Sequence, residues 1–407
     1  MIDQRPLAGI RVLDLSRVLA GPFCAMNLAD LGAEVIKIEL PGRGDDSRGY
    51  APRIPNSDDS GYYYSVNRGK LSATVDLRKP AGVAVALDLV RHCDVVLENF
   101  APGTMERFNL GYARLAAVNP RIILCSISGF GQSGPMASAP AYDIVAQALG
   151  GTMSITGPAN GDPTRCGVSI GDLTAGLYGV IAILSALRLR ERTGVGRHLD
   201  IAMLDCQVAL LEDALARYST TGKVPGPLGS RHPSITPFQQ FRAADGYFVA
   251  GAGNESLWAR FCDAIGTPEL KSDSRFTANS ERTANHAELE SILNRHFAAQ
   301  PREHWLKLLG EAGVPCAPIA SVAEVTRNPH LQARQMILHA QHPTFDGLIV
   351  PGSPLKTAAG PAGERAEASG VPNTRAPALG EHTERVLREV AGYDAEKIAA
   401  LRAADVI

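Results

Sequence analysis

The segment from residue 10 to residue 39 alternates strand and helix patterns over a short length of chain. Ile10–Ser16 (IRVLDLS) and Glu34–Glu39 (EVIKIE) are apolar runs typical of buried strands, and Gly21–Gly32 between them has the pattern of a helix ended by glycine. A strand, a helix and a strand within about 30 residues form a βαβ unit with parallel strands. Because a parallel sheet is covered by helices on both faces, the segment predicts an α/β fold.

The same alternation continues along the first half of the chain. Further helical patterns cover 83–91, 113–118, 172–192 and 204–218, and further strand patterns cover 94–100, 121–128 and 197–202. The helix at 172–192 is apolar almost all round in its first three turns, which favours a buried position. We therefore predict a large, open, Rossmann-like parallel sheet with helices on its faces.

Open parallel sheets bind ligands at the carboxyl ends of their strands. The first such end, Ser16–Pro22 (SRVLAGP), lacks the GxGxxG motif, so a dinucleotide cofactor is not expected. Later strand ends and nearby loops supply cations, an amide and an aromatic ring. Arginine and lysine suit phosphates and an aromatic ring stacks on a base, although any one of these cations could instead be a solvated surface charge. The residues that we expect to meet a phosphorylated, base-bearing ligand are Arg17, Lys70, Arg78, Asn99, Phe100 and Arg107.

The pattern changes from Phe238 onward. FRAADGYFVAGAG predicts a hairpin that turns at Asp245-Gly246, and short helical segments follow it. The preceding residues 221–237 are rich in Gly, Pro and Ser, which is typical of a linker. We expect 1–220 to form the first part of a large domain, 221–237 a linker, and 238–335 a smaller α+β domain.

Charge and composition exclude several classes of protein. The 407 residues hold 40 Lys+Arg and 42 Asp+Glu without a basic block, so we expect no nucleic-acid partner. The longest apolar run is about 13 residues, whereas a membrane span needs about 20. Seven scattered cysteines without a CxxC motif predict reduced core thiols in a cytoplasmic protein. The ten histidines show no metal-ligand spacing.

Residues 140–176 gather acidic and turn-forming side chains. Asp143 begins an apolar helical segment, Thr156–Pro163 (TGPANGDP) is a tight loop, and Asp172 begins the long helix. Two helix caps and a surface turn would explain the pattern structurally. Carboxylates at element ends are also where a binding or catalytic site is built.

Motifs spread over nearly the whole chain identify a family resemblance. They are LDLSRVLAGP, GAEVIKIE, GRGDDSRGY, NRGKLSATVDL, DVVLENFAPGTMERFNLG, NPRIILCSISGFGQSGP, YDIVAQALGG, GVSIGDLTAG, HPSITPFQQFRAADGYFVAGAGN and GEHTERVL. In this order they resemble the family III CoA-transferases, which also include the 2-methylacyl-CoA racemases. The resemblance implies homodimers of interlocked rings, with a large CoA-binding domain and a small domain in each chain. It also implies that 336–407 returns to complete the large domain, with 221–237 and 355–377 as crossings.

The resemblance carries over to most of the CoA site. Ala20, Asn99, Phe100 and Arg107 stand where family members hold CoA, and Arg78 stands where a lysine is common. Three positions depart from the family pattern, so we expect Arg43 or Lys70 to take over some of their contacts. The departures are Arg17 for a frequent histidine, Leu19 for a glutamine and Leu40 for an arginine.

The same comparison places the transferase nucleophile in the 156–163 loop, as an aspartate. Asn160 stands at that position here and Asp162 follows two residues later. Four interpretations remain: Asp162 serves in a shifted loop, Asn160 is an engineered substitution, Asn160-Gly161 deamidates, or the protein has another activity. Racemases place a histidine where Tyr142 stands and aspartates at positions matching Asp143 and Asp172, the latter a catalytic base.

The expected activity is transfer of CoA from an acyl-CoA, such as succinyl-CoA, to a free carboxylic acid through covalent catalysis. A 2-methylacyl-CoA racemase and an acyl-CoA-binding protein without a nucleophile are the alternatives. The CoA thioester is the substrate, and no permanently bound cofactor is expected. Expected oxyanion donors and acyl-site residues are Gly150, Gly151, Gly161, Gly229, Ser230, Arg48, Tyr50, Arg231 and His232.

Overall fold

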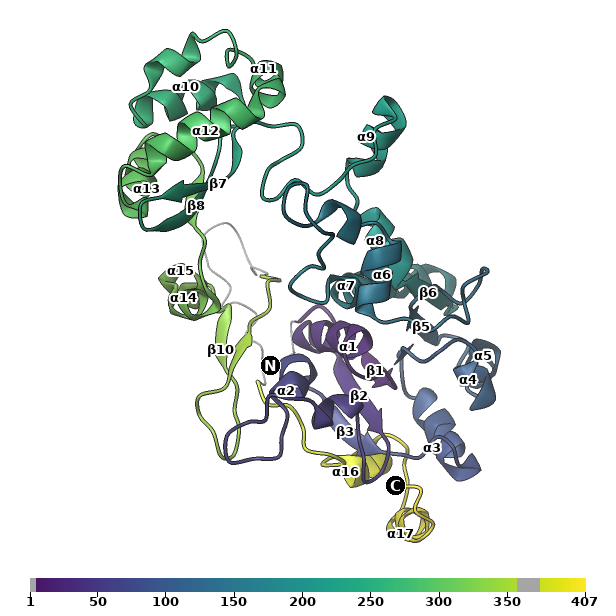
Figure 1. Cartoon of the computed structure of the whole chain (residues 1–407). Coiled ribbons are helices and arrows are strands. Elements are labelled where there is room, and N and C mark those ends of the chain that lie inside the picture. Colours follow the sequence, from purple (N-terminus) through teal and green to yellow (C-terminus); the bar gives the residue numbers. More distant parts are fainter. Residues whose placement is uncertain (1–4, 357–373) are drawn as a thin grey trace. The chain divides into compact units, whose positions relative to one another are not determined.

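The computed structural model describes residues 5–356 and 374–407, and it contains two compact units (Figure 1). Unit 1 comprises residues 1–152, 166–215 and 329–407, and unit 2 comprises 153–165 and 216–328. The segment 153–165, which the sequence analysis assigned to the large domain, thus clusters with the second unit. The expected crossing at 355–377 lies mostly outside the described residues.

A six-stranded parallel sheet forms the centre of unit 1, as an α/β fold requires. Its order is β3-β2-β1-β4-β5-β6, in which β1 lies between β2 and β4. The strands are β1 (Arg11–Asp14), β2 (Glu34–Glu39), β3 (Leu71–Thr74), β4 (Val95–Glu98), β5 (Ile123–Ser128) and β6 (His198–Ala202). Sequence reasoning missed β3 because its four residues, LSAT, contain no apolar run.

Side chains alternate between the two faces of this sheet. Val12 and Val95 join one core with helices α1 (Ala20–Asp30) and α7 (Ile170–Thr193). Leu13 and Val96 join a second core on the opposite face. The helices that contribute to this second core are α3 (Pro80–Val90), α4 (Thr104–Arg107), α5 (Tyr112–Val118), α16 (Thr383–Glu389) and α17 (Ala395–Ala403).

Helix α7 packs directly on α1 because glycines remove the side chains between them. A Cβ on Gly176 would lie 2.8 Å from the carbonyl oxygen of Ala20, and one on Gly179 would lie 3.1 Å from the sulfur of Cys24. By length and composition α7 is the one helix of the described chain that could cross a membrane. Half of its most apolar window is buried within the fold, as in the core helix of a soluble domain.

The helix predicted over 204–218 is wrong as a single element. It is divided into α8 (Met203–Ala209) and α9 (Ala214–Thr221), and Glu212 between them has a φ of 52°. A left-handed residue cannot continue a right-handed helix. Helix α6 (Asp143–Leu149) and α8 both pack against α7.

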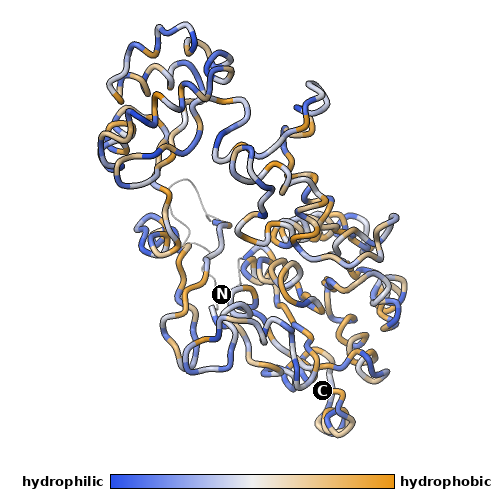
Figure 2. The backbone as a smooth tube through the Cα atoms, in the orientation of Figure 1, coloured by the Kyte–Doolittle hydropathy of each residue, from blue (hydrophilic) through white to orange (hydrophobic). Residues whose placement is uncertain are grey.

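Unit 2 is built around a three-stranded antiparallel sheet in the order β7-β8-β9. The predicted hairpin forms, but its two-residue turn is Ala244-Asp245 and not Asp245-Gly246, because Gly246 already pairs with Ala243 as the first residue of β8. Figure 2 shows apolar and polar residues alternating along the helices of this unit. Phe241, Phe248 and Phe297 lie in its buried core. The elements are β7 (Phe238–Ala243), β8 (Gly246–Gly251), β9 (Cys316–Pro318), α10 (Glu255–Ala264), α11 (Asn279–Ala284), α12 (His286–Phe297), α13 (Arg302–Glu311) and α14 (Val322–Arg327).

The remaining elements connect these layers. Helix α2 (Gly61–Asn67) precedes β3, and the short strands β10 (Ile337–His339) and β11 (Ile349–Pro351) form an antiparallel pair. A short helix, α15 (Pro329–Ala333), precedes β10, and three 3₁₀ turns cover Asp46–Gly49, Met153–Ile155 and Pro268–Lys271. All seven cysteines are unpaired, as predicted.

Candidate active site

The strand order of unit 1 reverses between β1 and β4, and this point locates the site. The chain leaves β1 through residues 15–19 and leaves β4 through 99–103, so both loops emerge at the same edge of the sheet. Such a switch point is where doubly wound sheets bind ligands. Two pockets open there, and both are lined by Arg17, Phe100 and Ala101.

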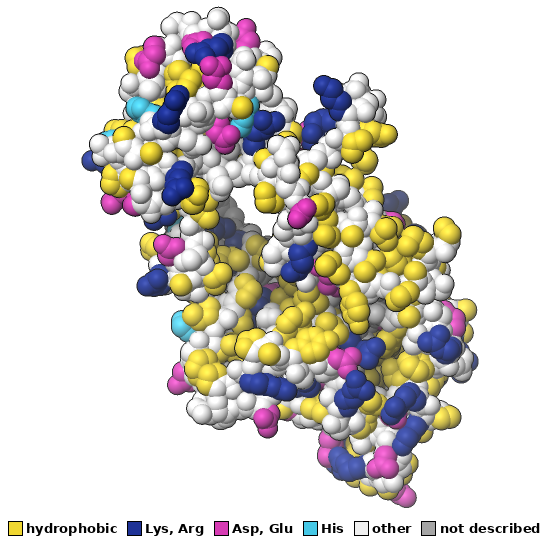
Figure 3. Space-filling model, viewed as in Figure 1, with side chains coloured by type: hydrophobic (Ala, Val, Ile, Leu, Met, Phe, Trp, Pro, Cys, Tyr) yellow, Lys and Arg dark blue, Asp and Glu magenta, His cyan; other side chains and the backbone are white. Residues whose placement is uncertain are grey.

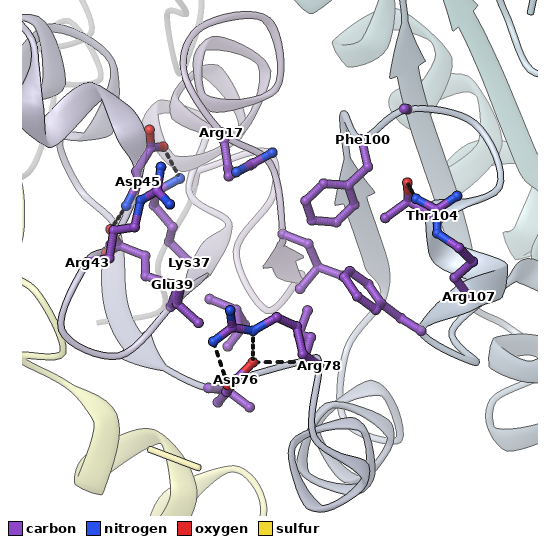
Figure 4. A pocket seen from close by; sticks show the side chains of 18 residues that line it. Arg17, Lys37, Glu39, Arg43, Asp45, Asp76, Arg78, Phe100, Thr104 and Arg107 are labelled. Carbon is purple, nitrogen blue, oxygen red and sulfur yellow. Dashed lines mark hydrogen bonds and ion pairs between the residues drawn. The ribbon is translucent and has the colours of Figure 1, made fainter. Parts of the chain in front are cut away.

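The first pocket, of about 360 Å³, is lined by several arginines and by Phe100 and Phe108 (Figure 4). Arg17 lies over the Phe100 ring, with its guanidinium carbon 5.5 Å from the ring centroid. Arg107 donates to Thr104 at 2.7 Å, while Arg78 is bound by Asp76 through two bonds of 2.8 and 2.9 Å. These hydrogen bonds from Arg78 lower the pKa of Asp76. Cations around an aromatic wall suit a nucleotide with several phosphates.

The loop between the two pockets is held by side chains that bond its backbone. Asn99 accepts from the N–H of Arg17 at 2.7 Å and donates to the carbonyl of Arg17 at 2.8 Å. Asp45 accepts from the N–H of Val18 at 3.1 Å, and Lys37 donates to the carbonyl of Ser16 at 2.7 Å. Asn99, expected as a ligand contact, thus fixes the loop that carries Arg17.

Lys70 lies beneath the site and does not line either pocket. Its ammonium group is fully buried, with bonds of 2.9 Å to Asp14, 2.9 Å to Asn67 and 3.0 Å to the carbonyl of Pro22. An ammonium group has three N–H donors, so these bonds use all of them. We therefore leave Lys70 out of the phosphate contacts and assign it to support of the β1–α1 connection.

The second pocket, of about 400 Å³, places a carboxylate beside the start of α1. Asp172, in the first turn of α7, lines it together with Leu19, Ala20, Asn99 and the highly exposed Tyr142. Burial, with Asp143 as a second negative charge nearby, raises the pKa of Asp172 to about 7. The first N–H groups of α1 have no intrahelical acceptor, so they provide donors at the same pocket.

Asp143 has a structural position although it stands close to Asp172. Its buried carboxylate accepts from the N–H of Gly171 at 2.8 Å and from the amide of Gln147 at 2.7 Å. These bonds join the start of α6 to the start of α7. The two carboxylates named from sequence are therefore brought together, with Asp172 facing the pocket.

Asn160 lies in unit 2, at the third position of a tight turn. The N–H of Gly161 donates to the carbonyl of Pro158 at 2.8 Å, and Asn160 has a φ of 57°. Turns of this kind need a positive φ at the third position, which Asn tolerates better than most residues. Asp162 is exposed in the same loop. The turn geometry thus gives a structural reason for asparagine at this position.

Several expected acyl-site residues lie outside both pockets of unit 1. Arg48 is bound to Glu39 at 2.7 and 2.8 Å and to the Tyr63 hydroxyl at 2.6 Å. A Cβ on Gly150 would lie 2.3 Å from that of Gln207, so this glycine permits the packing of α6 on α8. Gly151, Tyr50 and His232 do not line these pockets, and Gly161, Gly229, Ser230 and Arg231 belong to unit 2.

Sequence reasoning missed supporting residues that have no ligand-type motif. Glu98 accepts from the N–H of Phe100 at 2.7 Å, and burial raises the pKa of Glu98 to about 7. Tyr62 is near Asp172, since burial first and the negative charge of Asp172 second raise the pKa of Tyr62 to about 12. Only the position of Glu98 at the end of a predicted strand signalled a role.

Comparison with known proteins agrees with this geometry. Residues 7–383 match CoA-transferase family III. Acetyl-CoA:oxalate CoA-transferase of Acetobacter aceti is 46% identical over 352 residues, covering 86% of this chain and 89% of that protein. Succinyl-CoA:glutarate CoA-transferase of Homo sapiens is 41% identical over 407 residues, covering 100% of this chain and 91% of that protein. A crystal structure of a CAIB/BAIF family protein from Brucella suis superposes with a TM-score of 0.82 at 38% identity, covering 95% of this chain and 99% of that one.

The chain therefore belongs to CoA-transferase family III, and it is an enzyme of the CoA-transferase class. The resemblance stated from sequence is confirmed, as is the mixed α/β fold of the family.

Proposed function

We propose that this enzyme transfers CoA from a dicarboxylyl-CoA, such as succinyl-CoA, to a free dicarboxylic acid, with Asp172 as the nucleophile. Relatives at 36–46% identity are named for oxalate, glutarate, mesaconate and citramalate as acceptors, and each of these acids carries two carboxylates. The substrate class is carried over from these names, and the placement of the chemistry comes from the pockets of unit 1.

The two contiguous pockets divide the CoA thioester between them. The phosphates and adenine belong in the first pocket, where Arg17, Arg43, Arg78 and Arg107 supply positive charge and Phe100 supplies a ring for stacking. The pantetheine arm then passes the shared wall of Arg17 and Phe100 into the second pocket. Its thioester end would thereby reach the pocket that holds Asp172.

The position of Asp172 in the second pocket is the observation that carries the proposal. Among the four residues expected to act in catalysis, it alone lines a pocket of unit 1. Asn160 has no carboxylate and occupies a turn, and both carboxylate oxygens of Asp143 already accept hydrogen bonds. We therefore move the nucleophile from the 156–163 loop to the start of α7.

The proposed reaction consists of four nucleophilic attacks. The Asp172 carboxylate attacks the thioester carbonyl, the C–S bond breaks, and CoA thiolate leaves behind a mixed anhydride. The thiolate attacks the aspartyl carbonyl of this anhydride and releases the donor acid, which gives an aspartyl-CoA thioester. The acceptor carboxylate attacks that thioester, the C–S bond breaks, and CoA thiolate leaves behind a second mixed anhydride. The thiolate then attacks the acceptor acyl carbonyl of this anhydride, which releases the new acyl-CoA and regenerates the Asp172 carboxylate. Backbone N–H groups at the start of α1 are the donors best placed for the tetrahedral oxyanions.

A racemase has less support. Its chemistry needs an acid and a base on opposite faces of the α-carbon. Tyr142 stands where the racemases place a histidine, and no histidine is among the residues that line the second pocket.

Replacement of Asp172 by asparagine tests the proposal. We expect Asp172→Asn to lower kcat by at least about a thousandfold, because the covalent route is lost while CoA binding remains. Hydroxylamine added during turnover should place a hydroxamate on Asp172 in peptide mass mapping. Asp162→Asn is the matched control and should keep activity within about twofold. An adduct on Asp162, or an active Asp172→Asn enzyme, would return the nucleophile to the loop.

We also propose that the chain acts as a cytoplasmic homodimer. Apolar side chains are exposed on the adjoining helices α6, α7 and α8, the region of unit 1 where yellow atoms gather in Figure 3. Leu149 is 56% exposed and Ile181 is 57% exposed. An apolar surface of this kind is typical of an interface between subunits.

A further inference from the structure

Unit 2 has a pocket of its own, of about 670 Å³, whose lining does not include the proposed nucleophile Asp172. The turn at 158–160, the linker residues 228–231, strand β7 and helix α12 supply its lining. Strand β7 is at the edge of its sheet, so residues from both faces of the strand reach the pocket.

The wall formed by α12 and β7 is polar, and two of its polar side chains, Gln239 and His286, are buried. His286 is buried, and its Nε2 is paired with the side-chain oxygen of Gln239 at 2.5 Å. The amide nitrogen of Gln239 donates to Glu290 at 2.7 Å. Burial, followed by the positive charge of Arg231, lowers the pKa of His286, so this imidazole is neutral at pH 7. A neutral His286 leaves Glu290 as the one charged group among these three hydrogen-bonded side chains.

Arg231 provides positive charge without a partner. Its guanidinium is half-buried at the pocket, and no hydrogen bond or ion pair joins it to another described side chain. Arg242 also lines the pocket, and its only described side-chain contact is with the ring of Tyr247, at 6.0 Å. The pocket therefore carries two arginines against the single carboxylate of Glu290. An unpaired guanidinium beside fixed polar groups suits a planar carboxylate, which it can bind through two hydrogen bonds.

We propose that this pocket binds the free dicarboxylic acid, with Arg231 paired to one of its carboxylates and Arg242 supplying charge for the other. The choice of a dicarboxylic acid rests on the proposed function. The site itself rests on the unpaired Arg231, the excess of arginine over carboxylate and the size of the pocket.

The turn that holds Asn160 has a place in this proposal. The N–H of Gly229 donates to the carbonyl of Gly157 at 2.9 Å, which joins the turn to the linker that carries Arg231. Pro158, Ala159 and Asn160 line the pocket beside Gly229. The sequence signal at 156–163 is thus accounted for by a wall of the acid pocket.

Calorimetric titration of the full-length enzyme with glutarate, in the absence of CoA, tests the site. We expect Arg231→Met to weaken glutarate binding at least about tenfold, because a charge-assisted pair is lost. In steady-state assays the same change should raise KM for the acid about tenfold and leave KM for the acyl-CoA within about twofold. Arg231→Lys keeps the positive charge but lacks the two parallel N–H donors of a guanidinium. Its affinity for glutarate should lie between those of the parent and of Arg231→Met, and it provides the test if the Met variant folds poorly.

Arg295→Met is the matched control, since Arg295 is exposed on α12 and does not line the pocket. It should bind glutarate like the parent. Glutarate binding that is unchanged in Arg231→Met, or equally weakened in Arg295→Met, would overturn the proposal.

The two proposals fail separately. Glutarate binding that depends on Arg231 in an enzyme without CoA-transfer activity would refute the dicarboxylate transfer and keep the pocket, whereas transfer without such dependence would refute the pocket alone.

Discussion

Val18 shows how single residues prepare the site. It has a φ of 68°, which is strained for a β-branched residue, and it stands in the loop between the two pockets of unit 1. The N–H of Val18 donates to Asp45, and Asn99 bonds the backbone N–H and carbonyl of the preceding residue, Arg17. Asp45 is itself held by Lys37, 2.8 Å away and fully buried. Strain of this kind persists only where neighbours fix it, and such places are commonly functional.

The raised pKa of Asp172 predicts a dependence on pH. Between about pH 4 and pH 7 the unfolded chain ionises this carboxyl group while the folded protein keeps it protonated. The folded state therefore binds more protons, and the contribution of Asp172 to stability falls as the pH rises through this window. We expect Asp172→Asn to melt at a higher temperature than the parent at pH 8 and to lose this advantage by pH 4. Thermal melts at the two pH values measure the difference.

In the parent enzyme, the rate of acyl-enzyme formation should rise with pH, with a midpoint near 7, because the nucleophile is the ionised carboxylate. Rapid-quench measurement of the first turnover provides the profile. A rate that is flat from pH 5.5 to 8.5 would contradict the assignment of Asp172.

At the scale of elements, the site depends on the contact between α1 and α7. Helix α1 begins at the loop that carries Arg17, and α7 carries Asp172 in its first turn. The two helices approach closely at Gly176 and Gly179. A change in their separation would therefore move Asp172, the proposed nucleophile, relative to the two pockets of unit 1.

Gly176→Leu tests this dependence. The new side chain would collide with the Ala20 carbonyl, so we expect a loss of about 1–3 kcal/mol in the free energy of unfolding, together with reduced kcat. Gly310→Ala is the control, because nothing lies within 4 Å of a Cβ at this position in α13. It should stabilise the protein by roughly 0.5–1 kcal/mol. Urea unfolding measures both, and a Gly176→Leu protein as stable as the parent would show that the helices can separate freely.

At the scale of the whole molecule, the exposed apolar surface on α7 predicts self-association. Leu177, Tyr178 and Ile181 are 45%, 40% and 57% exposed on one helix. Ile181→Asp would place a charge in the proposed interface, and we expect it to raise the dimer dissociation constant at least about a hundredfold. Val322→Asp, at an 81% exposed position on α14, should leave the dimer intact. Sedimentation velocity distinguishes the two, and a parent enzyme that is monomeric at micromolar concentration would contradict the prediction.

The sequence by itself predicted five of the six strands of the sheet, the family, and the edge of the sheet at which we propose that CoA binds. Apolar runs with helices between them predicted β1, β2, β4, β5 and β6, because a buried parallel strand has a continuous apolar signal. The ends of these strands could then be located, and Asn99 and Phe100, which directly follow β4, do line the second pocket. These features are local, so pattern and spacing are sufficient to predict them.

Only the tertiary structure decided which polar residues line a pocket. Lys70 and Arg48 are cations of the kind that bind phosphates and carboxylates. Both are instead paired inside the fold, Lys70 with Asp14 and Arg48 with Glu39. Asp143 and Asp172 are equivalent in sequence, and packing leaves only Asp172 facing the pocket. Asp14 is 56 residues from Lys70 along the chain, and Gly171 is 28 residues from Asp143. Burial and pairing depend on such distant contacts, and no local pattern records them.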